Sequence, residues 1–182
     1  VGSNREDISM VVLKNVSFSY HTAEHNSGVY DINLTIPSGQ VVLFCGASGC
    51  GKTTVTRLIN KLAPSYYFGE LKGEVLIDGV DSSKASLYEL SKKIGSVFQN
   101  PRSQFFSVDS TSEIAFGCEN TGVPRDEMYR RIGQVADSLN IEHLLDRNLF
   151  ALSGGEKQKI ACASVAAMQP EIFILDEPSS NL

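Results

Sequence analysis

Apolar and polar residues alternate through much of the N-terminal part of the chain, which is the pattern of strands with one buried face. Residues 11–36 hold two such stretches on either side of the polar segment 21–28, and this arrangement predicts an antiparallel hairpin. Residues 73–79 predict a further strand and a turn. The sequence therefore predicts an N-terminal antiparallel β-subdomain.

Two uninterrupted apolar runs, residues 41–45 and 172–175, break this alternation. Such runs are typical of strands that are buried on both faces of a parallel sheet. Residues 54–59 follow the first run and predict a helix with one apolar face, formed by Val55, Leu58 and Ile59. The predicted fold class is therefore α/β, with a mainly parallel core sheet.

Between residues 100 and 151 the pattern becomes helical, and we expect a helical insertion there. Its clearest amphipathic stretch, residues 124–139, places four apolar side chains on one face: Met128, Ile132, Val135 and Leu139. Ser153 and Glu156 have the spacing of a capping box and open a further helical segment, which Pro170 ends.

A glycine-rich loop joins the first apolar run to the helix after it. Residues 46–53 read Gly-Ala-Ser-Gly-Cys-Gly-Lys-Thr and match the phosphate-loop pattern Gly-x4-Gly-Lys-Thr. Glycines let backbone N–H groups turn inward around a phosphate, and the helix N-terminus adds the positive end of its dipole. We expect Lys52 to reach the β- and γ-phosphates and the Thr53 hydroxyl to bind Mg²⁺.

An ordinary glycine-rich turn is the alternative, and the Lys-Thr pair with a strand before it and a helix after it argues against that reading. Cys50 fits a loop residue better than a nucleophile, because the loop needs backbone donors at its position. The predicted nucleotide-binding residues of this loop are Gly46, Ser48, Gly49, Cys50, Gly51, Lys52, Thr53 and Thr54.

Two acidic residues follow the second apolar run. Asp176 and Glu177 would stand at the C-terminal end of a buried strand, where parallel sheets bind their ligands. Asp176 suits the Mg²⁺ held by Thr53, and Glu177 can orient and deprotonate the water that attacks the γ-phosphate. In the alternative interpretation, these acids only cap the next helix.

The predicted capping box carries two glycines, which leave N–H groups and the Ser153 hydroxyl open to an anion. A simple N-cap is the alternative for Ser-x-x-Glu alone. Residues 152–158, Leu-Ser-Gly-Gly-Glu-Lys-Gln, resemble the signature motif of the ATP-binding cassette (ABC) family. In that family two cassettes close head to tail, and the resemblance implies that the motif contacts ATP on the opposite domain through Ser153, Gly154, Gly155 and Gln158.

The resemblance to an ABC ATPase domain covers residues 11–182. It implies that Tyr20 stacks on adenine, although an aromatic residue ending a strand is otherwise an ordinary sheet residue. It also implies that Gln99 is the Q-loop glutamine, which touches Mg²⁺ and the attacking water, although a lone Gln before Pro is usually a solvated turn. The expected catalytic residues are then Glu177, Gln99 and Lys52, and the expected metal ligands are Thr53, Gln99 and Asp176.

Residues 99–106, followed by residues 113–117, resemble the ATPases of energy-coupling factor (ECF) transporters, which power uptake of vitamins, cobalt or nickel. The resemblance implies a P-loop NTPase that hydrolyses ATP with Mg²⁺ to drive transport. Its partners would be a second ATPase domain and a transmembrane subunit that selects the substrate. It would be located on the cytoplasmic face of the membrane.

Composition narrows the alternatives. The chain has 182 residues, of which 42% are hydrophobic, so it can bury one sizeable core, and none of its apolar runs is long enough to span a membrane. A net charge of -5 without a basic run argues against nucleic-acid binding. The four cysteines and three histidines show no metal-site spacing and predict free thiols in a reducing compartment.

The sequence also leads to expectations for the two ends of the chain. Residues 1–10 read as an N-terminal extension whose first three residues are typical of a cloning remnant. Residues 179–182 resemble the start of the family's D-loop, and the family's next strand, with its switch histidine, would lie between the runs 41–45 and 172–175. The sequence thus predicts a piece of a longer protein, such as half of a tandem ATPase, that hydrolyses ATP poorly by itself.

Two other function classes remain open at this point. A soluble ABC ATPase could act on ribosomes or DNA, although the short span from Gln99 to Ser153 excludes the coiled-coil chromosome-maintenance members. A regulatory module that binds nucleotide without turnover is the other, and the presence of Glu177 argues against it.

Overall fold

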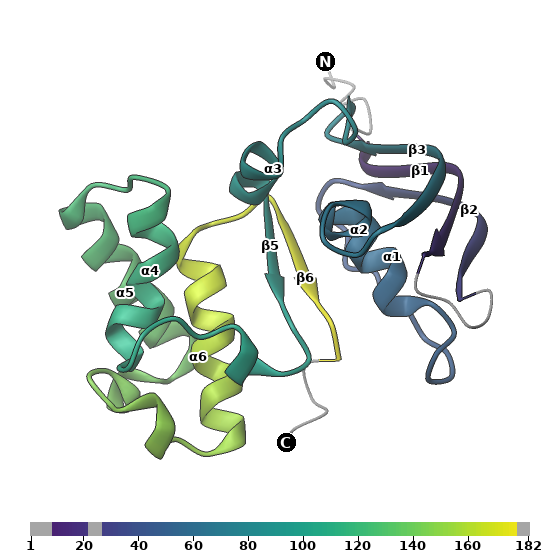
Figure 1. Ribbon diagram of the computed structural model, residues 1–182. Coiled ribbons are helices and arrows are strands. Elements are labelled where there is room, and N and C mark those ends of the chain that lie inside the picture. Colours follow the sequence, from purple (N-terminus) through teal and green to yellow (C-terminus); the bar gives the residue numbers. More distant parts are fainter. Residues whose placement is uncertain (1–8, 22–26, 178–182) are drawn as a thin grey trace. The chain divides into compact units, whose positions relative to one another are not determined.

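The computed structural model describes residues 9–21 and 27–177 (Figure 1). The chain divides into two compact units, Val1–Ser91 and Lys92–Leu182, which are taken separately below. The expectations for residues 1–8 and for the D-loop at 179–182 lie outside the described residues.

The first unit contains a four-stranded antiparallel sheet with strand order β2-β1-β3-β4. Its strands are β1 (Ser9–Tyr20), β2 (Gly28–Pro37), β3 (Gly69–Ile77) and β4 (Val80–Asp81). The predicted hairpin is confirmed as the β1–β2 pair, and the predicted third strand is β3, which pairs with the other edge of β1. The alternating apolar residues of β1 and β3 are buried, as in Leu13, Phe18 and Ile77.

Two helices follow the glycine-rich loop in this unit, α1 (Lys52–Ile59) and α2 (Leu62–Ser65). The buried side of α1 is formed by Thr54, Thr56, Leu58 and Ile59. Val55, which we placed on that face, is only half-buried, so the buried side of the helix includes two threonines that the apolar pattern did not mark.

The second unit holds a two-stranded parallel sheet and a group of helices. α3 (Leu87–Lys93) spans the boundary between the units and ends directly before β5 (Ile94–Val97), which pairs in parallel with β6 (Ile172–Leu175). The helices α4 (Ser110–Asn120), α5 (Arg125–Leu139) and α6 (Gly154–Ala167) pack against one another, and α6 also contacts β5. Three short 3-10 turns lie at Pro101–Ser103, Glu142–Leu144 and Leu149–Ala151.

The apolar face expected for residues 124–139 is present in α5. Met128 and Ile132 are buried, and Val135 and Leu139 pack against the same helical core. That core also takes in fully buried residues of α4 and α6, including Ile114 and Ile160. The helices between residues 100 and 151 are therefore held to α6 by an extended apolar cluster.

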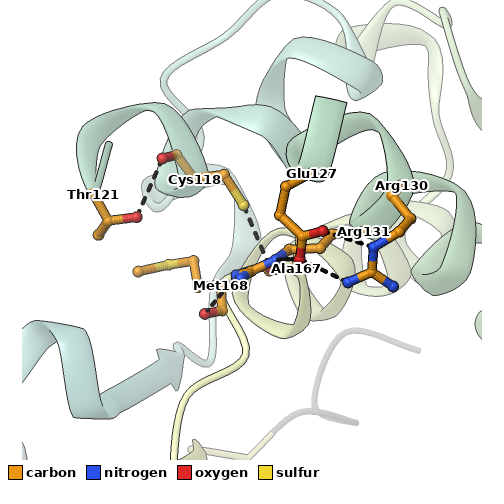
Figure 2. A network of polar contacts seen from close by, with 7 residues as sticks. All are labelled: Cys118, Thr121, Glu127, Arg130, Arg131, Ala167 and Met168. Carbon is orange, nitrogen blue, oxygen red and sulfur yellow. Dashed lines mark hydrogen bonds and ion pairs between the residues drawn. The ribbon is translucent and has the colours of Figure 1, made fainter. Parts of the chain in front are cut away.

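A polar network fastens α5 to the C-terminal end of α6 (Figure 2). Glu127 accepts hydrogen bonds from Arg130 and from Arg131 Nε, and Arg131 also donates to the carbonyl oxygens of Ala167 and Met168, at 3.4 and 3.5 Å. Hydrogen bonds from Arg130 and Arg131 lower the pKa of Glu127 to about 2. The cation of Arg131 thus lies at the negative end of the α6 dipole, where it is favourable.

The two predicted buried strands need correction. Residues 41–45 belong to none of the sheets in the described part of the chain, and Val41 and Leu43 are 100% and 83% exposed. β6 does form, but Phe173 and Leu175 are exposed and only Ile174 is buried. An inner strand of a parallel sheet is buried only when other strands pair with both of its edges. Among the described residues, the segment 41–45 pairs with no strand and β6 pairs with β5 alone, so neither segment has the environment that its apolar sequence suits.

Candidate functional site

The glycine-rich loop leads into α1 through a left-handed N-cap. Gly51 has a φ of 100°, and a Cβ at this position would lie 2.6 Å from Val29 Cγ1, so both the backbone angle and the space require glycine. Gly51 also offers no side chain to the first-turn N–H groups, an arrangement typical of anion-binding helix N-termini.

Lys52 closes over this loop. Its ammonium group donates to the carbonyl oxygens of Gly46 and Ala47, both at 3.0 Å. The cation is therefore already directed into the turn formed by the preceding residues. Phosphate oxygens are stronger acceptors for an ammonium group than neutral carbonyls, so a bound phosphate would compete for the same donor.

Tyr20 is tied to α1 within the first unit. Its hydroxyl lies 3.1 Å from Thr54 Oγ1 and accepts a hydrogen bond from Arg57 at 3.3 Å. Its ring meets the ring of Phe18 edge to face, with centroids 4.8 Å apart and planes at 86°. The structure thus fixes the residue expected to stack on adenine relative to the helix that starts at the phosphate loop.

In the second unit, the ends of the two parallel strands bring Gln99 and Glu177 together. Gln99 Nε2 donates to Glu177 Oε2 at 3.0 Å, although the residues are 78 positions apart. The N–H of Asp176 donates to the Val97 carbonyl at 3.0 Å, which extends the parallel pairing up to the acidic pair. Glu177 itself has a φ of 45°, an unusual angle for a non-glycine residue and one that often marks functional sites.

Of the residues expected to hold Mg²⁺, Thr53 belongs to the first unit, and Gln99 and Asp176 belong to the second. Their hydroxyl, amide and carboxylate oxygens are the hard donors that Mg²⁺ prefers. Among residues 9–21 and 27–177, no group of three or more His, Cys, Asp or Glu side chains could hold a metal ion. A cation shared between a few protein oxygens and nucleotide phosphates fits this donor set, whereas an all-protein cage does not.

The capping box of α6 is formed by both of its hydrogen bonds. Glu156 N–H donates to Ser153 Oγ at 3.3 Å, and Ser153 N–H donates to Glu156 Oε2 at 2.8 Å. These bonds lower the pKa of Glu156. Ser153 and Gly154 are exposed, so the first turn of α6 is open to a ligand or a partner.

Gln158 differs from the rest of the signature stretch. Its side chain is 6% exposed, and neither its amide nitrogen nor its amide oxygen has a hydrogen-bond partner in the described part of the chain. Contact with a nucleotide on another domain would require this side chain to leave its buried position. The geometry therefore gives no support to the contact predicted for Gln158.

Three polar residues shape the second unit in ways that we did not predict. Lys157 is 4% exposed and donates to the carbonyls of Leu152 and Phe150 just before the signature glycines. Gln104 accepts from Phe98 N–H at 3.1 Å and donates to the Ser96 carbonyl at 3.2 Å, which holds the turn after Gln99. The third residue, Glu113, is 2% exposed and accepts two backbone hydrogen bonds. Gln104 and Glu113 lie inside the ECF-like stretches, but the sequence of those stretches does not indicate which backbone groups these side chains bind.

A cleft of about 390 Å³ lies beside this region of the second unit. It is mostly apolar, with exposed Phe106 and Phe150 on its wall, and it is lined by Arg102, Phe105, Phe106, Ser107, Val108, Leu149, Phe150 and Lys157. The segment that follows Gln99 and the segment that precedes Ser153 thus share one surface.

All four cysteines are free: Cys45 and Cys50 are exposed, Cys118 is buried and Cys162 is half-buried. Burial raises the pKa of the Cys118 and Cys162 thiols. Cys45 was expected in a buried strand, and its exposure follows from the unpaired segment 41–45.

The chain is similar to ABC transporter ATP-binding proteins. The family model described as ABC transporter matches residues 29–180. A putative ABC transporter ATP-binding protein of Treponema denticola is 55% identical over 173 residues, which cover 95% of this chain and 35% of the relative. The energy-coupling factor transporter ATP-binding protein EcfA1 of Mycoplasmopsis synoviae is 40% identical over 173 residues, 95% of this chain and 63% of that protein.

Among solved structures, CbiO1 from Clostridium perfringens, described as part of the ABC transporter complex cbiONQ, superposes with a TM-score of 0.82. It is 30% identical, and the match covers 96% of this chain and 67% of that one. The chain spans about a third of the length of the first curated relatives that it matches.

None of the helices in the described residues is long and apolar enough to cross a lipid bilayer. The family model covers most of the sequence and includes the glycine-rich loop, Gln99, the capped signature turn and the acidic pair. This chain belongs to the ABC transporter family.

Proposed function

We propose that this chain is the ATP-binding and ATP-hydrolysing part of a membrane transporter. Two observations support the proposal: in the first unit Lys52 folds over the glycine-rich loop, and in the second unit Gln99 donates a hydrogen bond to Glu177. The loop suits a triphosphate, and the Gln99–Glu177 pair suits an attacking water.

Binding would begin at the loop. Lys52 exchanges the carbonyls of Gly46 and Ala47 for β- and γ-phosphate oxygens, and the N-terminus of α1 adds backbone donors and its dipole. Tyr20, held by Thr54, offers its ring to the base. Loop and tyrosine lie in one unit, so binding of ATP should not depend on a second domain.

Hydrolysis would use the second unit. Glu177 accepts a proton from the water that attacks the γ-phosphate, and Gln99 orients that water and the carboxylate. Mg²⁺, held by Thr53, Gln99 and Asp176, would neutralise charge that develops on the phosphates. In the structure Gln99 already donates a hydrogen bond to Glu177 Oε2, so the amide and the carboxylate are held beside one another.

A second ATPase domain would complete the site. The exposed first turn of α6 presents Ser153 and the N–H groups of Gly154 and Gly155 to the γ-phosphate bound by the opposite domain. This head-to-tail pair could be formed by two chains or by two halves of one longer chain. We propose a transmembrane subunit as the further partner, which places the ATPase on the cytoplasmic face of the membrane.

An ECF-type importer is the transporter class that the relatives favour. EcfA1 is described as an energy-coupling factor transporter ATP-binding protein and CbiO1 as part of the ABC transporter complex cbiONQ, and residues 99–106 and 113–117 resemble the ECF group. The cargo would then be a vitamin or a metal ion, selected by a membrane subunit.

The test is Glu177→Gln in the complete protein. Glutamine keeps the shape and the hydrogen bond to Gln99 but cannot accept a proton, so we expect turnover to fall about 10²-fold or more while ATP binding is retained. Glu171→Gln, an exposed acid before β6, serves as the matched control and should keep wild-type turnover. Near-normal phosphate release by Glu177→Gln would remove Glu177 from the mechanism.

Contacts between the two domains are tested by Gly154→Asp. A carboxylate at this exposed turn would face the γ-phosphate of the opposite domain, so hydrolysis should be lost while ATP binding by the single domain is unchanged. Equal loss of binding by the single domain would show that the turn acts on its own nucleotide.

A further inference from the structure

A guanidinium group connects Tyr20 to a second tyrosine that the proposed function does not use. Arg57, in the last turn of α1, donates from Nη1 to the Tyr20 hydroxyl at 3.3 Å. The central carbon of the same guanidinium lies 3.7 Å from the centroid of the Tyr67 ring. Arg57 thus contacts two tyrosines in different ways: it donates a hydrogen bond to the Tyr20 hydroxyl, and its guanidinium lies over the face of the Tyr67 ring.

The backbone holds Tyr67 beside the end of β1. Tyr20 is the register partner of Gly69 in the β1–β3 pair, and His21 N–H donates to the Phe68 carbonyl at 3.1 Å. On the other side, Tyr67 N–H donates to the Leu62 carbonyl at 3.0 Å. The backbone is therefore held at Tyr67 and at the residue after it, and the Tyr67 ring is in contact with Arg57.

Arginine suits this position for a geometric reason. A guanidinium is planar, so it can stack its face on an aromatic ring while its edge still donates hydrogen bonds. A lysine ammonium has no such plane and could not serve both contacts with one orientation. Tyr67 thereby restricts the rotation of Arg57, and Arg57 restricts the Tyr20 hydroxyl.

The Tyr20 ring is then constrained on three sides. Its hydroxyl contacts both Thr54 and Arg57, and its ring packs edge to face on Phe18. Stacking on a flat base depends on the orientation of the ring plane, so a tyrosine held in advance loses less freedom when it binds the base.

We propose that Arg57 and Tyr67 are positioning residues for nucleobase recognition, which hold the Tyr20 ring in the plane that stacks on the base of a bound nucleotide. The proposal rests on the proposed function, because it takes the phosphates to lie in the loop at residues 46–53. It adds that base affinity depends on a cation–aromatic pair outside that loop.

The experiment compares two probes, Mg-ATP and inorganic Mg-tripolyphosphate, by calorimetry on the chain. Arg57→Met keeps the aliphatic stem and removes the guanidinium, and Tyr67→Leu removes the ring. Both should weaken ATP binding by about 5- to 10-fold, within the range of one base–aromatic stack, and leave tripolyphosphate binding unchanged. Tyr67→Phe should restore the affinity lost in Tyr67→Leu.

Two controls separate positioning from general damage. Tyr66→Leu changes the neighbouring exposed tyrosine and should bind both probes as wild type does. In a Tyr20→Leu background, Arg57→Met should cause no further loss of ATP affinity, because its effect acts through the Tyr20 ring. If Arg57→Met does not fold, Tyr67→Leu still tests the proposal, because Tyr67 lies outside α1.

Unchanged ATP affinity in Arg57→Met, equal loss for both probes, or a full additional loss in the Tyr20→Leu background would each overturn the proposal. Failure of the proposed function would give a different result. The wild-type chain would then bind neither probe, or the Lys52→Ala variant would bind both probes as tightly as the wild type does.

Discussion

The carboxylate of Glu113 holds the segment after Gln99 against α4, and we expect its removal to destabilise this part of the second unit. Its Oε2 accepts the N–H groups of Phe106 and Ser107, at 2.9 and 2.8 Å. The Phe106 ring stacks on Phe116 of α4, with centroids 4.8 Å apart and planes at 13°. Two backbone bonds and one ring contact thus depend on the position of Glu113.

The expected cost follows from these bonds. A hydrogen bond to a charged group contributes about 1.5–3 kcal/mol and a neutral one about 0.5–1.5 kcal/mol, so Glu113→Gln should lose about 2 kcal/mol over two bonds. Glu113→Ala leaves both N–H groups without their acceptor, at about 1–3 kcal/mol each. Because Phe106 is 73% exposed and water can reach part of this segment, we expect about 3 kcal/mol for the alanine variant.

Native-state hydrogen exchange at the amides of α4 is the suitable assay, because it reports the opening of this helix rather than of the whole two-unit chain. The control is Glu119→Ala, which removes an exposed acid from the same helix and should change the free energy of opening by less than about 0.5 kcal/mol. If Glu113→Ala resembled Glu119→Ala, the two backbone bonds would not stabilise the segment and the reasoning would fail.

Three further predictions concern other parts of the chain. The folded pKa of Glu127 is about 2, below its ordinary value of 4.5, so the stability that it contributes should be complete above about pH 5 and be lost as the pH falls toward 2; Glu127→Gln should remove this dependence in urea titrations. Mg-ATP should slow maleimide labelling of exposed Cys50 and leave the slow labelling of buried Cys118 unchanged, as read by mass spectrometry; equal Cys50 rates would contradict a nucleotide over the loop. A Cβ at Gly69 would lie 2.4 Å from Phe18 Cζ, so Gly69→Ala should lower the free energy of unfolding by about 1–3 kcal/mol, and an unchanged value would refute the close packing.

Features that depend on near neighbours in the sequence could be predicted. The capping box needs only Ser153 and Glu156, three positions apart, and both of its hydrogen bonds are present. Glycine at position 51 could be expected from the phosphate-loop pattern, and the structure shows that the left-handed N-cap of α1 also requires glycine there. The β1–β2 hairpin follows from alternation on both sides of one polar segment.

Features that depend on distant partners could not be predicted. Residues 41–45 have the composition of an inner strand, but composition does not supply the neighbouring strand, and the segment is unpaired among the described residues. The Arg57–Tyr67 contact crosses from a helix to the segment before β3, and no local pattern marks it. The burial of Gln158 within the signature stretch likewise depends on how α6 packs, which a motif does not describe.

Calorimetric titration of the chain with Mg-ATP, in wild type and in Lys52→Ala, shows whether the glycine-rich loop binds a triphosphate. We expect saturable binding by the wild type and a loss of about 100-fold in Lys52→Ala, which corresponds to two charge-assisted hydrogen bonds to phosphate. Lys72→Ala, which removes an exposed lysine from β3, should bind as the wild type does. Equal affinity in Lys52→Ala and wild type would contradict the assignment of the glycine-rich loop as the triphosphate site.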